Sequence, residues 1–277
     1  MNSIAQALQA GAAMGLERLD AQLLLLHALG RASTDRGWLL AHDTDKLDPG
    51  PSQRFQDACR RRTGGEPVAY IVGRKEFFGL ELVVDPRVLV PRPETETLVE
   101  WALEVLPHAA GDSPSVIDLG TGSGAIALAI KQQRPDAQVE AVDASSDALA
   151  VARANAQALS LAISFRQASW LDGAGSYDLI ASNPPYVAQD DPHLAALRHE
   201  PLGALAAGPD GLRDIRLIIT QATTHLRRGG WLLLEHGYDQ APAARSLLDA
   251  AGFSQVASRG DLAGIDRCSG GQWLELG

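Results

Sequence analysis

The sequence predicts an α/β protein: a mostly parallel β-sheet, covered by helices on both faces, that follows a small helical domain. Short apolar runs, each ending at a polar residue or a glycine, recur after about residue 112, and helix-like segments separate them. Such alternation requires crossover connections, which are typical of parallel sheets. Apolar residues at helical spacing over residues 1–65 predict the helical domain.

Three segments are expected along the chain. Residues 1–65 carry apolar positions such as Ile4, Ala7 and Leu8 at helical spacing, and the breaks between them predict about four helices. Residues 66–90 are rich in β-formers and punctuated by glycines, which predicts a β-hairpin linker. Residues 91–277 are expected to form the larger domain.

Within the larger domain, the expected strands and helices alternate. Ligands of parallel sheets bind beyond the carboxyl ends of the strands, so the residues that end the apolar runs are the candidates for function. The strands are expected at 115–120, 138–143, 177–182 and 231–237, with a further short strand before Trp170, and the helices at 123–133 and 145–159.

Composition disfavours several classes of protein. A net charge of -10 and a pI near 5.1 argue against direct binding of nucleic acid, which depends on clustered Lys and Arg. No apolar stretch approaches the length of a membrane span and no secretory signal is visible, so a cytoplasmic protein is expected. Cys59 and Cys268 form no disulfide framework, and the histidines lack metal-ligand spacing, so no metal is expected.

A glycine-rich turn follows the first strand of the large domain, in "DLGTGSGAIALAI". Gly120, Gly122 and Gly124, with Thr121 and Ser123 between them, let the backbone turn tightly against a ligand at the start of a helix. Nicotinamide, flavin and sulfonium-cofactor proteins all use such turns, and a plain strand-to-helix turn is the alternative. The turn therefore predicts a nucleotide-like cofactor without identifying it.

Two further residues suit a nucleoside. Asp143 ends the second strand roughly twenty residues after the glycines, where a carboxylate can accept hydrogen bonds from both ribose hydroxyls. A helix N-cap is its alternative role. Trp170, after the third strand, could shield an adenine face or be a structural tryptophan.

The run 177–182 ends at Asn183-Pro184-Pro185-Tyr186. Prolines donate no backbone hydrogen bond and keep the preceding residue extended, so an ordinary turn is one interpretation. The other is a site for a planar nitrogen. If the Asn183 oxygen and the Pro184 carbonyl accept its two N–H bonds, the nitrogen faces a methyl donor while Tyr186 packs on the flat group. This constellation resembles that of class I S-adenosylmethionine-dependent methyltransferases.

Longer stretches make the resemblance more specific. "VLVPRPETETLVEWAL", "DLGTGSGAIALAI", "SNPPYV", "HEPLGALAAGPDGL", "LLLEHG" and "DLAGIDR" closely resemble the release factor glutamine N5-methyltransferases over nearly the whole chain. The resemblance implies a Rossmann-like class I fold with a mostly parallel seven-stranded sheet, preceded by a small helical bundle. It also implies methylation of the glutamine in the GGQ motif of peptide chain release factors. Because the helices of residues 1–65 carry none of the groups at the strand ends, we expect them to recognise the factor rather than take part in the chemistry.

The site residues that the resemblance implies follow the same motifs. S-adenosyl-L-methionine would be contacted by Gly120 to Gly124, Asp143, Trp170 and Asn183, and the glutamine amide would be held by Asn183, Pro184, Pro185 and Tyr186.

Four alternatives stay open at this point. A ribosomal protein glutamine methyltransferase is the nearest, although the proline-flanked "PRPETE" favours the release factor enzyme. An adenine-N6 DNA methyltransferase should carry a basic target-recognition region. A nicotinamide dehydrogenase leaves the Asn-Pro-Pro-Tyr motif without a role, and a non-catalytic binding module would transfer no methyl group.

The chain itself contains the target motif, in "SGGQW". The alternating "QWLELG" that starts at Gln272 predicts a final strand, whose pairing would hold Gln272 away from the site.

Overall fold

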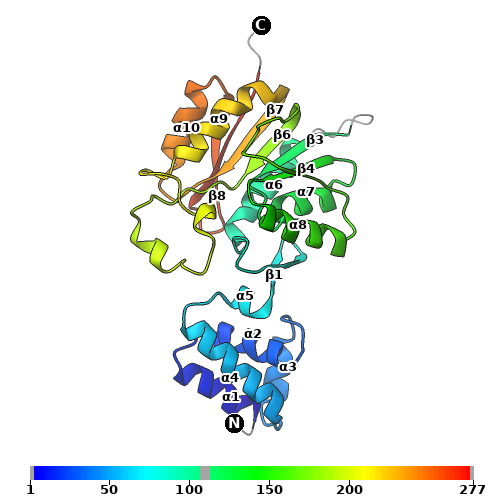
Figure 1. Cartoon of the computed structure of the whole chain (residues 1–277), viewed down its shortest axis with the longest axis vertical. Coiled ribbons are helices and arrows are strands. Elements are labelled where there is room, and N and C mark those ends of the chain that lie inside the picture. The colour runs from blue at the N-terminus through cyan, green and yellow to red at the C-terminus, as the bar shows by residue number, and fades with distance from the viewer. Residues whose placement is uncertain (1–2, 107–112, 275–277) are drawn as a thin grey trace. The chain divides into compact units, whose positions relative to one another are not determined.

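The computed structural model describes residues 3–106 and 113–274, which fall into two compact units, Met1–Arg74 and Lys75–Gly277 (Figure 1). The first unit extends beyond the expected domain 1–65, because the residues that follow position 65 join its core.

The first unit is a bundle of five helices in its described part. Its core surrounds the fully buried leucines Leu24 to Leu26 and Phe55, with Leu39 from a neighbouring helix. The helices are α1 (Ile4–Ala13), α2 (Arg18–Ala28), α3 (Arg36–Ala41), α4 (Pro49–Thr63) and α5 (Val68–Val72).

Helix α5 corrects the expected linker 66–90. Its sequence, "VAYIV", is rich in β-formers, but Ile71 is buried in the core of the bundle, and that packing outweighs local propensity. Gly73, at a φ of 78°, ends the helix in the left-handed conformation. The hairpin is therefore shorter than expected and consists of β1 (Arg74–Phe77) and β2 (Leu80–Val83).

The second unit contains the mostly parallel seven-stranded sheet, which confirms the predicted fold class. The strand order is β5-β4-β3-β6-β7-β9-β8, with β9 antiparallel to both of its neighbours. The strands are β3 (Ser115–Leu119), β4 (Gln138–Asp143), β5 (Ser164–Gln167), β6 (Tyr177–Ser182), β7 (Leu226–Glu235), β8 (Ser254–Gly260) and β9 (Asp266–Gln272).

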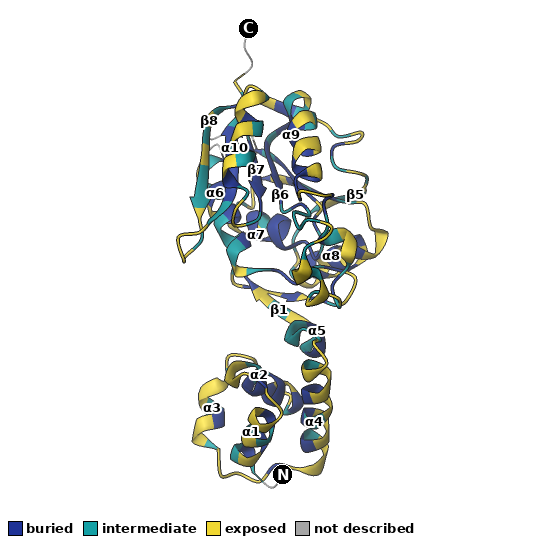
Figure 2. Cartoon of the chain, turned by 90° about the vertical axis from the view of Figure 1, so that its left-hand side faces the viewer, coloured by how far each residue is buried: buried dark blue, intermediate teal, exposed yellow. Residues whose placement is uncertain are grey.

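Helices cover both faces of this sheet (Figure 1). Because side chains alternate along a strand, Val116 packs on one face and Ile117 on the other. The first face lies under α6 (Glu96–Val105), α7 (Ala125–Gln133) and α8 (Ser146–Ala158), and the second under α9 (Arg213–His225) and α10 (Ala241–Ala250). Figure 2 shows the buried residues of the central strands between these helices. Short 3₁₀ turns lie at Pro93–Thr95, Pro192–Ala195 and Leu202–Ala204.

The order of the strands fixes where a ligand can bind. From β3 the chain steps outward to β4 and β5, then returns to place β6 on the opposite side of β3. At such a reversal the connections leave the two adjacent strands in opposite directions, which opens a crevice at their carboxyl ends. Gly120 follows β3 and Asn183 follows β6, so the two predicted motifs meet at this crevice.

The last strand differs from the expected one. Strand β9 begins at Asp266 and ends at Gln272, so Gln272 closes the strand rather than opening it. Gln272 pairs with Trp231 of β7 and Ser254 of β8, and its Nε2 donates to the carbonyl of Gly229 at 2.8 Å. The expected pairing of Gln272 is thus confirmed, while residues 275–277 lie outside the described residues.

Two smaller expectations concern cysteines and the membrane. Cys59 and Cys268 are both free and buried. Within residues 3–106 and 113–274, no helix has both the length and the apolar character needed to cross a bilayer.

Candidate functional site

A cavity of about 350 Å³ lies at the carboxyl edge of the sheet. Its size falls in the range of pockets that bind small molecules and cofactors. Five of the residues predicted to contact the cofactor line it together: Gly120, Gly122, Asp143, Trp170 and Asn183. Their positions in the chain span more than sixty residues, so the fold brings separate strand ends to one place.

The glycines of the turn have different surroundings. A Cβ on Gly122 would meet no atom within 4 Å, so this position is open, although its φ of 54° favours glycine. A Cβ on Gly124 would lie 2.9 Å from Leu128 Cδ1 and 3.3 Å from Ala152 Cβ. Gly122 therefore lets a ligand approach the backbone, whereas Gly124 lets two helices pack closely.

Thr121 and Ser123, also predicted to contact the cofactor, are buried and do not line the cavity. The Thr121 hydroxyl donates to Oδ2 of Asp118 at 2.6 Å, and the Ser123 carbonyl accepts from Nδ2 of Asn155 at 2.9 Å. Burial raises the pKa of Asp118 to about 7, against the opposing hydrogen bonds from Thr121 and the Ala127 amide. The hydrogen bonds of Asp118 and Asn155 thus hold the glycine-rich turn from the side that faces the protein core.

Asp143 holds the glycine turn and also faces the cavity. Its Oδ2 accepts from the Gly122 amide at 2.9 Å, and its Oδ1 accepts from the Ser145 amide at 2.9 Å. Each carboxylate oxygen has a second lone pair. The group can therefore accept ribose hydroxyls while it keeps its backbone partners.

Trp170 lies against the glycine turn. A Cβ on Gly120 would be 3.4 Å from Cζ3 of the indole, so the ring packs directly on this part of the backbone. The φ of Trp170 is 48°, a left-handed conformation that is costly for a large side chain. Such strain is typical of functional positions, and here it accompanies an indole placed at the wall of the cavity.

The Asn183–Tyr186 motif is fixed at both ends. The Asn183 Nδ2 donates to the Thr95 hydroxyl at 3.2 Å, and the Tyr186 hydroxyl donates to Oε1 of Glu235 at 3.3 Å. Burial, and then the nearby Glu235 carboxylate, raise the pKa of Tyr186, so its phenol stays protonated at neutral pH. Of the four residues, Asn183 and Pro185 line the cavity, whereas Pro184 and Tyr186 do not.

The backbone of Tyr186 is held by a second set of contacts. Nε2 of Gln240 donates to the Tyr186 carbonyl at 3.0 Å, while Oε1 of Gln240 accepts from the Gly237 amide at 2.8 Å. A Cβ on Gly211 would lie 2.2 Å from the same carbonyl, so only glycine fits there. Two loops from distant parts of the chain thus confine the motif.

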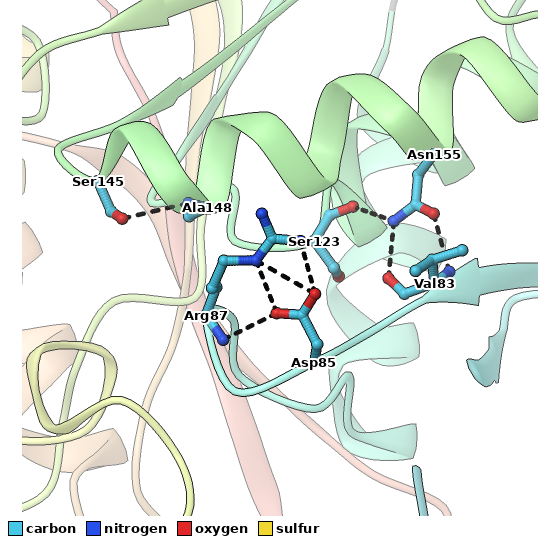
Figure 3. A network of polar contacts seen from close by, with 7 residues as sticks. All are labelled: Val83, Asp85, Arg87, Ser123, Ser145, Ala148 and Asn155. Atoms are coloured by element: carbon cyan, nitrogen blue, oxygen red, sulfur yellow. Dashed lines mark hydrogen bonds and ion pairs between the residues drawn. The ribbon is translucent and has the colours of Figure 1, made fainter. Parts of the chain in front are cut away.

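The sequence did not single out Arg87 or Asn155, which support the cavity (Figure 3). Arg87 lines the cavity and pairs with Asp85. The Asn155 side chain exchanges two hydrogen bonds with the backbone of Val83 and donates a third to the Ser123 carbonyl. Asn155 is a polar residue on the buried face of the helix expected at 145–159, and a buried polar residue in a helix indicates a specific hydrogen-bonding role.

Glu200 was also missed, although it lies in the quoted "HEPLGAL". Its carboxylate is buried, accepts from the Val90 amide at 3.1 Å and pairs with Arg92. It therefore ties the "VPRPE" segment to the loop that follows the Asn183–Tyr186 motif. Within the described ranges, no cluster of His, Cys, Asp or Glu is arranged to hold a metal ion.

The chain is similar to known methyltransferases along most of its length. The family model of the PrmC N-terminal domain matches residues 2–73, and that of the methyltransferase small domain matches residues 98–200. A methyltransferase structure from Pyrococcus furiosus has a TM-score of 0.54 at 18% identity and covers 79% of this chain and 99% of its own, which supports the fold alone.

Bacterial relatives of higher identity include two release factor glutamine methyltransferases. The release factor glutamine methyltransferase of Burkholderia pseudomallei is 49% identical, over 93% of this chain and 92% of its own length. That of Xylella fastidiosa is 48% identical, over 96% of this chain and 97% of its own. Identity of this extent over both units places the chain among S-adenosylmethionine-dependent enzymes, and it belongs to the release factor glutamine methyltransferase family.

Proposed function

We propose that this protein transfers a methyl group from S-adenosyl-L-methionine to the N5 side-chain amide nitrogen of the glutamine in the GGQ motif of a peptide chain release factor. One observation carries the proposal. Asn183 borders the cavity with its amide nitrogen bound to Thr95, and its Oδ1 has no hydrogen-bond partner among the described residues. That oxygen is available to accept an N–H of a substrate amide.

The chemistry explains why acceptors are needed. The lone pair of an amide nitrogen is delocalised into its carbonyl, so the nitrogen is a poor nucleophile. We assign Asn183 Oδ1 and the Pro184 carbonyl to the two N–H bonds of the glutamine, which fixes the nitrogen and directs its lone pair toward the donor. Tyr186 and Pro185 complete the contact with the flat amide. Transfer of the methyl group would break the S–CH₃ bond of the sulfonium, leave a neutral thioether, and release one N–H proton of the amide to solvent.

The cavity suits the cofactor in its donors and its walls. An acceptor carboxylate at Asp143, an indole at Trp170 and an open backbone at Gly122 meet the needs of a ribose, an adenine and a closely approaching ligand. When bound, the cofactor supplies an electrophilic methyl group on a sulfonium. The protein contributes alignment.

The glutamine site alone does not select the protein substrate. An amino-purine nitrogen or a ribosomal glutamine would meet the same two acceptors. The names of the relatives, and the match of residues 2–73 to the PrmC N-terminal domain, favour a release factor. The absence of direct nucleic acid binding and a cytoplasmic location are part of this proposal.

We assign recognition of the release factor to the first unit. It has its own core, and its surface carries a shallow hollow with two exposed leucines, Leu19 and Leu40, beside Arg18 and Arg36. Contacts at such a surface would enlarge the interface beyond the target loop.

A chain that begins at Arg74, the first residue of β1, tests this assignment. It should bind cofactor like the full chain, because the cavity lies within the second unit, but it should methylate the intact factor far more slowly. Calorimetry gives the cofactor affinity, and label transfer gives the rate. Equal rates for the folded short chain and the full chain would assign recognition to the second unit instead.

Replacement of the target glutamine tests the function itself. A release factor whose GGQ glutamine is changed to glutamate should take up no labelled methyl group from the wild-type enzyme, because the acceptor amide is missing. The matched change in the enzyme, Gln272→Glu, should leave methylation largely intact, since Gln272 is bound to the sheet. Mass mapping locates the label. Label on the enzyme's own C-terminal peptide, or on the altered factor, would refute the proposal.

A further inference from the structure

Thr95 begins helix α6 as its N-cap residue, but its hydroxyl does not cap the helix. Thr95 is also the last residue of the 3₁₀ turn Pro93–Thr95 and has helical φ and ψ of −65° and −19°, so it is not placed as an extended N-cap threonine is. Here the buried hydroxyl accepts from Asn183 Nδ2 at 3.2 Å and lies close enough to the Glu235 carboxyl to lower its pKa. The hydroxyl is thus not used by the helix backbone and faces two side chains.

The chemistry of these groups sets the direction of each hydrogen bond. A hydroxyl has a single hydrogen, and an ionised carboxylate only accepts. The hydrogen of Thr95 therefore goes to Glu235, and only lone pairs remain for Asn183. The amide of Asn183 must then present its NH₂ group to Thr95, which leaves Oδ1 on the other side.

We propose that Thr95 and Glu235 are positioning residues that fix the orientation of the Asn183 amide, with Oδ1 available to the substrate. The inference rests on the proposed function, because it concerns the acceptor for the glutamine N–H. The same carboxylate accepts from the Tyr186 hydroxyl at 3.3 Å, so it acts on both ends of the motif. Without this pair, the Asn183 amide can rotate and present a donor where an acceptor is needed.

Stability of the fold does not account for a glutamate at this position. The side chain is 1% exposed, and Oε2 has no hydrogen-bond partner among the described residues. Burial raises the pKa of Glu235 to about 7, against hydrogen bonds from Thr95 and Tyr186 that lower it. Since the folded pKa lies above the ordinary value, the ionised form costs stability at neutral pH. A functional requirement for the charged acceptor explains it.

The orientation of the Asn183 side-chain amide should therefore depend on pH. Below pH 7 the carboxyl of Glu235 is protonated and can itself donate to Thr95. The Thr95 hydrogen is then free for Asn183 Oδ1, and the opposite orientation of the amide becomes available. Methyl transfer should fall as the pH drops through about 7. The groups that face the Glu235 carboxyl are Thr95, Tyr186, Glu94, Arg267 and Cys268.

Single-turnover methylation of the release factor, with saturating cofactor from pH 6 to 9, tests the inference. Thr95→Val removes the hydroxyl at nearly constant shape, and Glu235→Gln removes the charge. We expect both to be about ten- to hundredfold slower than wild type at pH 8 and insensitive to pH near 7. The control Thr95→Ser keeps the hydroxyl and should retain both the rate and the loss of activity at low pH.

A variant and an NMR titration distinguish Glu235 from other groups that titrate near pH 7. The pKa of Asp118 is also raised to about 7, so a loss of activity at low pH is assigned to Glu235 only if Glu235→Gln abolishes it. In the cofactor-free protein, the ¹⁵N side-chain NH₂ signal of Asn183 should shift with a midpoint near pH 7, and this shift should disappear in both variants.

Contrary results are equally clear. A folded Thr95→Val enzyme with the wild-type rate, or a Glu235→Gln enzyme that keeps the low-pH loss, would overturn the inference. A wild-type enzyme that methylates no release factor would refute the proposed function, and the NMR titration would still decide the orientation of Asn183.

Discussion

Replacing Asn183 with alanine should lower the turnover number by about a hundred- to thousandfold at saturating cofactor and release factor. The substitution removes the side-chain oxygen assigned to one N–H of the glutamine, and losing one positioned hydrogen-bonding group of this kind costs about that much. The loss in stability should be small, on the order of 1 kcal/mol, because among the described residues the side chain makes one hydrogen bond, to Thr95.

Asn183→Gln is the matched control for this prediction. It keeps the amide but moves it by one methylene, so its turnover should also be low if alignment is what the residue provides. Rates are measured by incorporation of labelled methyl groups, and stability by denaturant unfolding. Turnover close to wild type in a folded Asn183→Ala enzyme would remove Asn183 from the reacting site.

Replacing Asp143 with alanine should weaken cofactor binding by roughly 1 to 3 kcal/mol, which is about 5- to 150-fold in the dissociation constant. Two effects contribute. The variant loses the charged acceptor for ribose hydroxyls, and it frees the amides of Gly122 and Ser145, which Asp143 holds at 2.9 Å each. The glycine turn should then be less well ordered before the ligand binds.

Calorimetric titration with S-adenosylmethionine measures the effect. Asp143→Asn removes the charge and one of the two acceptors for the Gly122 and Ser145 amides, so it should weaken cofactor binding but less than Asp143→Ala. Asp147→Ala, four residues further along and outside the cavity lining, removes an exposed carboxylate of the same region and should bind cofactor normally. An unchanged affinity in folded Asp143→Ala would exclude the ribose assignment.

Much of the fold could be predicted because its signals are local. Strands β3, β4 and β6 are short apolar runs bounded by polar residues, and α8 has a buried stripe, so the central architecture follows from periodicity. Helix α5 could not be predicted this way. Its β-forming residues become helical because Ile71 is buried in the core of the first unit, a contact with segments far away in the sequence.

The candidate site also has features that the local sequence predicts and features that depend on long-range contacts. The sequence by itself determined which groups stand at the strand ends, including Gly120, Asp143 and Asn183, since parallel strands must bring their carboxyl ends to one edge. It also predicted Trp170, and all four residues line one cavity. The roles of these residues in binding and catalysis stay predictions.

Only the tertiary structure decided what surrounds Asn183. Its partner Thr95 is 88 residues away in the chain, and Glu235 meets Tyr186 across 49 residues. No local pattern predicts such pairs, because the sequence around Thr95 is that of an ordinary helix start and Glu235 is a polar residue at the end of a strand. Burial removes water from both side chains, so the packed fold decides which of their polar atoms find partners: Thr95 accepts from Asn183 and Glu235 Oε1 accepts from Tyr186, while Glu235 Oε2 has none among the described residues.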